Sequence, residues 1–173
     1  MNILVVVDMQ NDFIDGVLGT PEAVAIVSKV AEKIREYESH DAVIIYTRDT
    51  HFRDYLDTIE GQNLPVPHCV FGTQGWNISE ALDADLTYCI NKTTFGSMEL
   101  PNYIDSIVNR EEIDSIEIVG LCTDICVISN AMILKAAYEN THIVVDSTCC
   151  AGVTPESHTN ALKAMEMCHI RVV

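Results

Sequence analysis

Two cysteines flank a short turn in the middle of the chain, and their position suggests nucleophilic chemistry. The segment Val119–Val127 reads as a strand, a tight turn and the start of a helix, with Thr123 placed to cap the helix. Cys126 would then lie in the first helical turn, where free amide groups and the helix dipole favour a thiolate. We therefore expect a lowered pKa for Cys126. Backbone N–H groups of the same turn could stabilise the oxyanion formed when a thiolate attacks a carbonyl carbon.

Other interpretations of these two cysteines remain open from the segment alone. A free cysteine is most often a small buried apolar side chain, and Cys126 fits that description too. Cys122 and Cys126 could share a soft metal, although two thiols without a second pair make a poor zinc site. They could also form a disulfide under oxidation. Residues elsewhere in the chain decide which of these interpretations of Cys122 and Cys126 is favoured.

A carboxylate and an amine supply what a nucleophilic cysteine needs. Asp8 directly follows the first apolar run, and Lys92 follows the third. A cysteine nucleophile requires a base that takes its proton and an acid that protonates the leaving group, and one carboxylate can do both in turn. A neighbouring ammonium keeps that carboxylate ionised and stabilises the thiolate. Taken singly, Asp8 could be a strand-end turn residue and Lys92 a solvated lysine.

A second cluster of polar residues lies between positions 48 and 76. Asp49, His51, Glu60 and His68 combine two carboxylates with two imidazoles, a ligand set suited to Zn, Fe, Mn or Co. Ordinary surface histidines in a loop would produce the same bare pattern. The spacing therefore indicates a candidate metal site without establishing it.

The elements around these residues alternate between strand and helix patterns. Short β-branched runs predict buried strands at Ile3–Val7, Ala42–Thr47, Thr87–Ile90, Ile116–Val119, His142–Val145 and Ile170–Val173. Helical patterns occupy Pro21–Glu38, Pro101–Asn109, Thr123–Glu139 and Pro155–Met167. This alternation predicts an α/β fold, a doubly wound and mainly parallel sheet of about six strands with helices on both faces.

The expected topology gathers the candidate residues at one edge. Ligand sites of such sheets lie beyond the carboxyl ends of the strands. Asp8, Asp49 with His51, Lys92 and the Cys122–Cys126 turn follow four successive strands. Residues 48–76 break the alternation, and a long insertion in a compact domain is usually functional.

Composition narrows the class of protein. The 173 residues are 48% hydrophobic and 21% charged, which indicates a single globular domain spanning residues 1–173. A net charge of −16, from 26 acidic and 10 basic residues, disfavours nucleic acid and anionic membrane partners. Seven cysteines, an odd number, and a start without a signal-peptide pattern lead us to expect reduced thiols in a cytoplasmic protein.

Three segments of the chain resemble a known enzyme superfamily. Val7–Phe13, Asn91–Ser97 and Gly120–Val127 are similar to the catalytic blocks of the isochorismatase-like cysteine hydrolases, which include nicotinamidases, N-carbamoylsarcosine amidases and isochorismatases. The resemblance covers nearly the whole chain in order. It implies that Asp8 is the base, Lys92 its partner and Cys126 the nucleophile. It also implies a cis peptide between Leu121 and Cys122, with the N–H groups of Cys122 and Cys126 forming the oxyanion hole.

The same resemblance extends to a metal site and to substrate contacts. Nicotinamidases carry Asp-x-His and a later Pro-His-Cys-Val-x-Gly-Thr, which Asp49–His51 and Pro67–Thr73 match. Their fourth ligand lies between these; Glu60 fits best, with Asp54 and Asp57 as fallbacks. The resemblance implies a divalent metal, zinc first and Fe or Mn as alternatives. Expected substrate contacts are Phe13, Phe95, Leu121 and Leu64, the last beside Pro65, which replaces an aromatic residue of the family.

These features together favour hydrolysis of a small carboxamide through a thioester, with nicotinamide as the leading substrate. One alternative is a hydrolase acting on another small amide or carbamoyl compound without metal. Another is a non-catalytic binding or scaffold protein that keeps the fold. The resemblance also leads us to expect a homo-oligomer.

Overall fold

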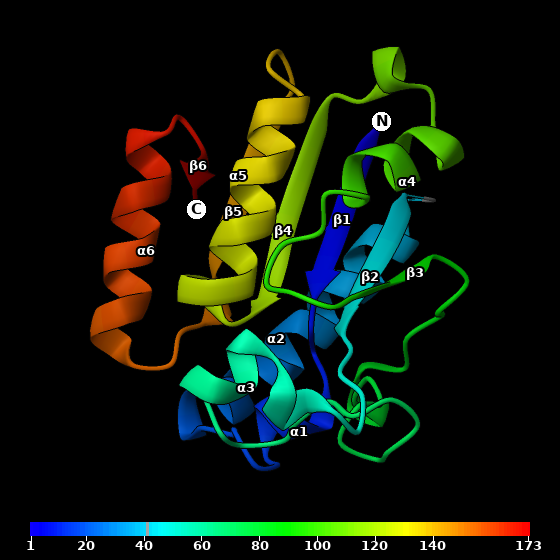
Figure 1. Ribbon diagram of the computed structural model, residues 1–173. Coiled ribbons are helices and arrows are strands. Elements are labelled where there is room, and N and C mark those ends of the chain that lie inside the picture. The colour runs from blue at the N-terminus through cyan, green and yellow to red at the C-terminus, as the bar shows by residue number, and fades with distance from the viewer. Residues whose placement is uncertain (41) are drawn as a thin grey trace.

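Six parallel strands form one sheet in the order β3-β2-β1-β4-β5-β6. The structure is a computed structural model that describes residues 1–40 and 42–173 (Figure 1). The strands are β1 (Asn2–Val7), β2 (Val43–Asp49), β3 (Cys89–Lys92), β4 (Ser115–Leu121), β5 (His142–Ala151) and β6 (Arg171–Val172). The expected doubly wound α/β fold is thus confirmed. Lys92, expected to follow the third strand, is its last residue.

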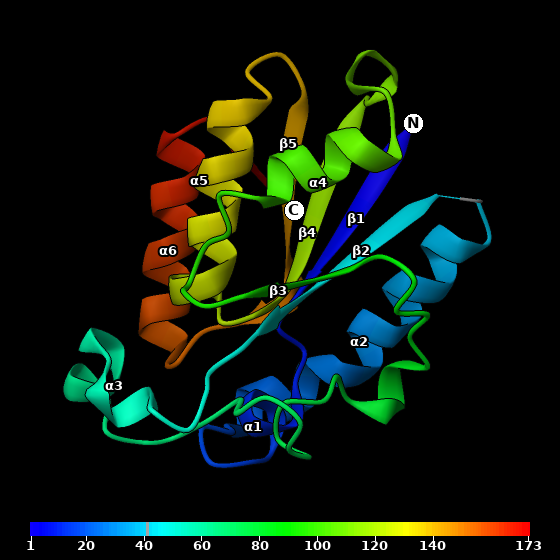
Figure 2. The same cartoon turned by 45° about the vertical axis from the view of Figure 1, so that its right-hand side comes forward.

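Helices cover both faces of the sheet. The long helix α2 (Pro21–Glu38) packs on one face, while α4 (Leu100–Ile107), α5 (Ile128–Ala137) and α6 (Pro155–Met167) pack on the other (Figure 2). Short helices α1 (Asn11–Ile14) and α3 (Ile59–Asn63) lie in the loops beyond the carboxyl ends of the strands. Short helical turns span Tyr55–Asp57, Glu80–Leu82, Arg110–Glu112 and Thr123–Val127. No helix among the described residues is long and apolar enough to span a membrane.

The central strand β1 divides the hydrophobic core into two layers. Ile3, Val5 and Val7 are fully buried toward α4, α5 and α6, while Leu4 and Val6 are fully buried toward α2. Alternate side chains of a strand point to opposite faces, so a strand covered on both sides is apolar throughout. This explains the uninterrupted apolar run at the start of the chain.

Strand register brings the predicted site residues to one edge. Val7 pairs with Thr47 of β2 and with Gly120 of β4, so the segments after these residues begin side by side. Gly120 has φ 118°, and a Cβ there would lie 2.1 Å from the carbonyl oxygen of Val7. Only glycine permits this close approach of the two backbones.

An ion cluster lies under α2, away from the predicted site. Lys33 Nζ lies 2.9 Å from Glu117 Oε1 on β4 and 3.1 Å from Asp146 Oδ2 on β5. Tyr37 donates a hydrogen bond of 2.6 Å to Glu117. Burial opposes ionisation of Asp146, but hydrogen bonds from Thr148 and Lys33 lower its pKa. The cluster therefore links α2 to the neighbouring strands β4 and β5.

Replacing Lys33 with methionine should destabilise the fold by about 2 kcal/mol, because it leaves two largely buried carboxylates without a cation. Urea unfolding measures the change. The pKa of Asp146 is lowered in the folded state. The stabilisation that its ion pair with Lys33 gives the fold is therefore present above the ordinary carboxyl pKa, and it disappears as pH falls through the lowered value. The double variant Lys33→Met/Glu117→Gln should recover part of the loss. Unchanged stability of the single variant would show that the ion pairs contribute nothing net.

Candidate active site

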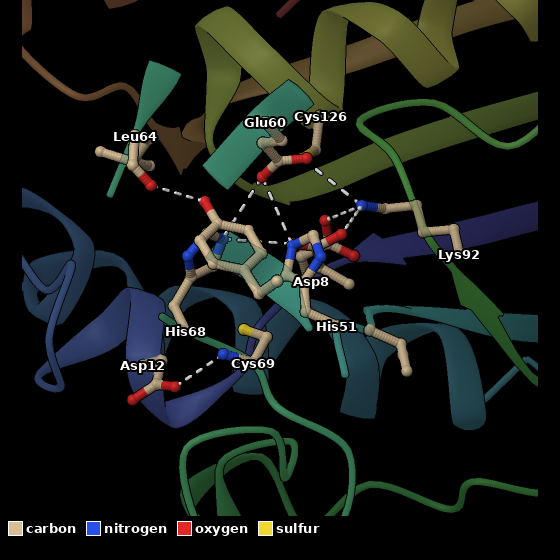
Figure 3. A network of polar contacts seen from close by, with 12 residues as sticks. Asp8, Asp12, His51, Glu60, Leu64, His68, Cys69, Lys92 and Cys126 are labelled. Atoms are coloured by element: carbon tan, nitrogen blue, oxygen red, sulfur yellow. Dashed lines mark hydrogen bonds and ion pairs between the residues drawn. The ribbon is translucent and has the colours of Figure 1, made fainter. Parts of the chain in front are cut away.

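The structure brings Asp8, Lys92 and Cys126 together in the protein interior. Lys92 Nζ lies 2.6 Å from Asp8 Oδ2 and 3.5 Å from Cys126 Sγ, and all three side chains are buried (Figure 3). Thr47 Oγ1 donates a 2.6 Å hydrogen bond to the other oxygen of Asp8. Asp8 itself has φ 47°, in the left-handed region that aspartate tolerates better than most residues. The arrangement can pass a proton between sulfur and carboxylate beside a fixed positive charge.

The charge state of the sulfur differs from the sequence prediction. Burial and the neighbouring Asp8 raise the pKa of Cys126 well above its usual value, against the opposing effect of Lys92. The expected lowered pKa is therefore wrong for the resting site, because desolvation outweighs the helix-terminal amides. Burial also raises the pKa of Asp8, although Lys92 opposes this. These surroundings therefore favour the neutral thiol of Cys126 over the thiolate.

Lys92 stays charged in this interior. Burial works to lower its pKa, but Asp8, Cys126 and Asp49 raise it well above the usual range. Its Nζ also lies 3.3 Å from Asp49 Oδ1, so the one ammonium links Asp8 and Cys126 to the second polar cluster.

The turn that carries Cys126 has an unusual backbone. The Leu121–Cys122 peptide is cis, as the resemblance implied. Thr123–Val127 form a π-helical turn, with the N–H of Val127 donating to the carbonyl of Cys122 at 3.0 Å. Thr123 does not cap the helix as expected; its hydroxyl pairs with His158 Nδ1 at 2.8 Å. Cys122 occupies the N-cap position instead.

The two thiols of this turn are free, as are all described cysteines. Burial and then Asp124 raise the pKa of Cys122 to about 12, and since the pKa of Cys126 is raised as well, the thiol pKa does not distinguish the two. Of the two sulfurs, only that of Cys126 has Lys92 within hydrogen-bond distance. Cys126, rather than Cys122, is therefore the candidate nucleophile.

Asp49, His51, Glu60 and His68 converge on one point. Their nearest ligand atoms all lie within 4.8 Å of one another. His51 Nε2 lies 2.9 Å from Asp49 Oδ2, and His68 Nε2 lies 3.5 Å from the same atom. The two nitrogens lie 3.4 Å and 3.6 Å from Glu60 Oε1 (Figure 3). A metal with bonds of about 2.1 Å has ligand atoms roughly 3.0 to 3.4 Å apart, so this donor set fits a divalent ion. Glu60, not Asp54 or Asp57, completes the group.

Surrounding contacts orient these donors. Nδ1 of His68 donates to the carbonyl of Val66 at 2.8 Å, which orients the ring so that Nε2 faces the cluster. Hydrogen bonds from His51 and His68 lower the pKa of Asp49 against the effect of burial, which keeps it an anion. Tyr55 packs its ring 4.6 Å from that of His51 and 5.1 Å from that of His68. These features are typical of a metal centre.

A cavity of about 320 Å³ connects the sulfur to the histidine cluster. It is lined by Phe13, Leu18, Thr20, Asp49, Glu60, Leu64, His68, Phe95, Cys122, Ile125, Cys126 and Val153. The predicted contacts Phe13, Leu64 and Phe95 thus lie on its wall. Leu121 does not line it, which corrects that prediction: its side chain is fully buried in the core layer facing α2.

Some residues of the site were missed by sequence reasoning. Tyr55, Thr47 and the cavity residues Leu18 and Val153 carry no motif that would have identified them. Gln10 and Asp12 lie inside the first resembling block, which is a signal that could have found them. Trp76 anchors its loop, with its indole N–H donating to Thr50 at 2.9 Å.

Comparisons with known proteins agree with this geometry. The isochorismatase domain matches residues 2–173. The nicotinamidase of Schizosaccharomyces pombe is 26% identical over 98% of this chain and 91% of its own length. A pyrazinamidase of Pyrococcus horikoshii in complex with zinc is 26% identical, with a TM-score of 0.82 over 99% of this chain and 98% of that one. The N-carbamoylsarcosine amidase of Thermoplasma acidophilum is also 26% identical, with a TM-score of 0.80 over 99% and 94%. Matched along almost its entire length, the chain belongs to the isochorismatase family.

Proposed function

We propose that this protein is a cysteine amidohydrolase that releases ammonia from a small carboxamide, with nicotinamide as the favoured substrate. One observation carries the proposal. Lys92 Nζ lies 2.6 Å from a buried carboxylate and 3.5 Å from a buried sulfur, and that sulfur lines a cavity shared with the histidine cluster. Similarity to a nicotinamidase and a pyrazinamidase supports the reaction class.

The reaction uses the same carboxylate in every proton transfer. Asp8 takes the proton of Cys126 as the sulfur attacks the carboxamide carbon, and the N–H groups of Cys122 and Cys126 hold the oxyanion. Collapse of this intermediate breaks the C–N bond, and Asp8 gives its proton to the leaving ammonia. Water then attacks the thioester, with Asp8 taking a proton from the water and returning one to the sulfur.

A divalent metal, zinc first among those that fit, would be held by Asp49, His51, Glu60 and His68. When bound, it would anchor the ring nitrogen of the substrate and order nearby water molecules. Phe13, Leu64 and Phe95 supply apolar walls for a ring.

The charges of the cavity favour a neutral substrate. Among the described residues, no lysine or arginine lines it, while Asp49 and Glu60 do. Without a bound cation, a substrate with its own carboxylate would meet like charges there. The alternative, a carbamoyl compound cleaved without metal, is therefore disfavoured where that compound carries a carboxylate. Similarity to an N-carbamoylsarcosine amidase keeps it as the second candidate.

Removing the metal should abolish or strongly reduce ammonia release from nicotinamide. Ammonia is measured across a panel of nicotinamide and carbamoyl compounds, before and after dialysis against a chelator, with metal content determined in parallel. Activity on nicotinamide that returns with zinc supports the proposal. A protein that contains no metal and cleaves carbamoyl compounds would establish the alternative. A chain inert toward every amide would leave a binding or scaffold role.

Two further parts of the proposal concern the cellular location and the oligomeric state of the protein. The seven free cysteines support a reducing, cytoplasmic environment. We also propose a homo-oligomer, which light scattering on the purified protein tests directly.

A further inference from the structure

We infer that Gln10 and Asp12 are positioning residues that hold the backbones of three of the four proposed metal ligands. They lie directly after Asp8, in the loop and first turn that follow β1. The inference rests on the proposed metal site and adds to it residues that bind no metal themselves.

The Gln10 side chain fixes the backbone of Asp49. Its amide oxygen accepts the N–H of Asp49 at 2.7 Å, and its amide nitrogen donates to the carbonyl of Asp49 at 2.9 Å. The same nitrogen donates to the carbonyl of Trp76 at 2.8 Å. Gln10 is fully buried, so a lost bond leaves unsatisfied polar groups that water does not reach. Both backbone groups of one ligand residue are therefore held by a single side chain.

The Asp12 carboxylate fixes the backbone of Cys69, which is hydrogen-bonded to His51 and follows His68 in the chain. Asp12 Oδ2 accepts the N–H of Cys69 at 2.8 Å, as Figure 3 shows. The carbonyl of Cys69 in turn accepts the N–H of His51 at 3.0 Å, and Cys69 follows His68 in the chain. Cys69 has φ 44°, a conformation that a non-glycine residue adopts only when its surroundings enforce it. The bond from Asp12 supplies that constraint.

The space around Asp12 is shaped for its carboxylate. A Cβ on Gly75 would lie 2.2 Å from the carboxylate atoms of Asp12, and the carbonyl of Gly75 accepts the N–H of Asp12 at 3.0 Å. Glu60, the fourth ligand, is held separately, since it lies on α3, where Thr58 caps the helix by accepting the N–H of Gly61 at 3.0 Å. The segment that begins with the proposed base thus also aligns Asp49, His51 and His68.

Zinc affinity, measured by competition with a chromophoric chelator, tests this role apart from activity. Asp12→Ala and Gln10→Glu should each weaken zinc binding by about 10- to 100-fold, the usual effect of losing a residue that orients ligands. Glutamate at position 10 keeps an acceptor but cannot donate to the carbonyls of Asp49 and Trp76. Asp12→Asn keeps an oxygen for the Cys69 N–H and should stay near the wild-type affinity.

Asn11→Ala is the matched control. Asn11 lies on the same helix as Asp12 and donates to the carbonyl of Gln74, but it does not touch a ligand segment. It should bind zinc as the wild type does. Wild-type affinity in both Asp12→Ala and Gln10→Glu, with only a lower melting temperature, would overturn the inference. So would an equal loss in Asp12→Asn and Asp12→Ala. A wild-type protein that binds no zinc would instead contradict the proposed metal site itself.

Discussion

Cys126→Ala should reduce ammonia release by at least about 10⁴-fold, because the variant lacks the atom that forms the thioester. The side chain is small and already buried, so the fold should persist. Ammonia assays on nicotinamide measure the loss. Mass spectrometry of the wild type quenched in acid during turnover should reveal an acyl adduct on Cys126 that the variant lacks.

Cys168→Ala is the control for this experiment. Cys168 is an exposed free thiol after α6, outside the residues that line the cavity. It should keep full activity. Ammonia release by Cys126→Ala at a wild-type rate would exclude covalent catalysis by this sulfur.

Lys92→Met should destabilise the protein by about 3 to 5 kcal/mol, the usual cost of removing one partner from a buried ion pair. Without the ammonium, the carboxylates of Asp8 and Asp49 lose the cation that lies 2.6 Å and 3.3 Å from them. Activity should fall by at least about 10³-fold, since no positive charge would stabilise the forming thiolate. Urea unfolding and ammonia assays on the same preparation measure both effects.

The double variant Lys92→Met/Asp8→Asn separates stability from catalysis. Removing the charge of Asp8 as well should restore part of the lost stability, because Asp49, which His51 and His68 also contact, is then the one carboxylate that has lost the ammonium. Activity should stay lost, since the base is gone. A single variant as stable as the wild type would contradict the ion pair, and a double variant that regained activity would contradict the role of Asp8.

The sequence by itself determined which residues meet at the edge of the sheet. Asp8, Asp49 and Cys126 each lie at or just beyond the end of an apolar run, and parallel strands present their carboxyl ends on one side. Strand and helix patterns depend on local side-chain periodicity, which is why the alternation, and with it the fold, was predictable. The order of the blocks along the chain then identified the family.

Only the tertiary structure decided the electrostatics and the supports of the site. The pKa of Cys126 is raised because burial and Asp8 act on it together. The sequence of the turn alone encodes neither this burial nor the proximity of Asp8. Glu60 joins the histidines, whereas Leu121 points into the core, because α3 and β4 orient these side chains. The bonds from Gln10 and Asp12 span 39 and 57 positions of sequence. Such contacts depend on how distant segments pack, which local periodicity does not determine.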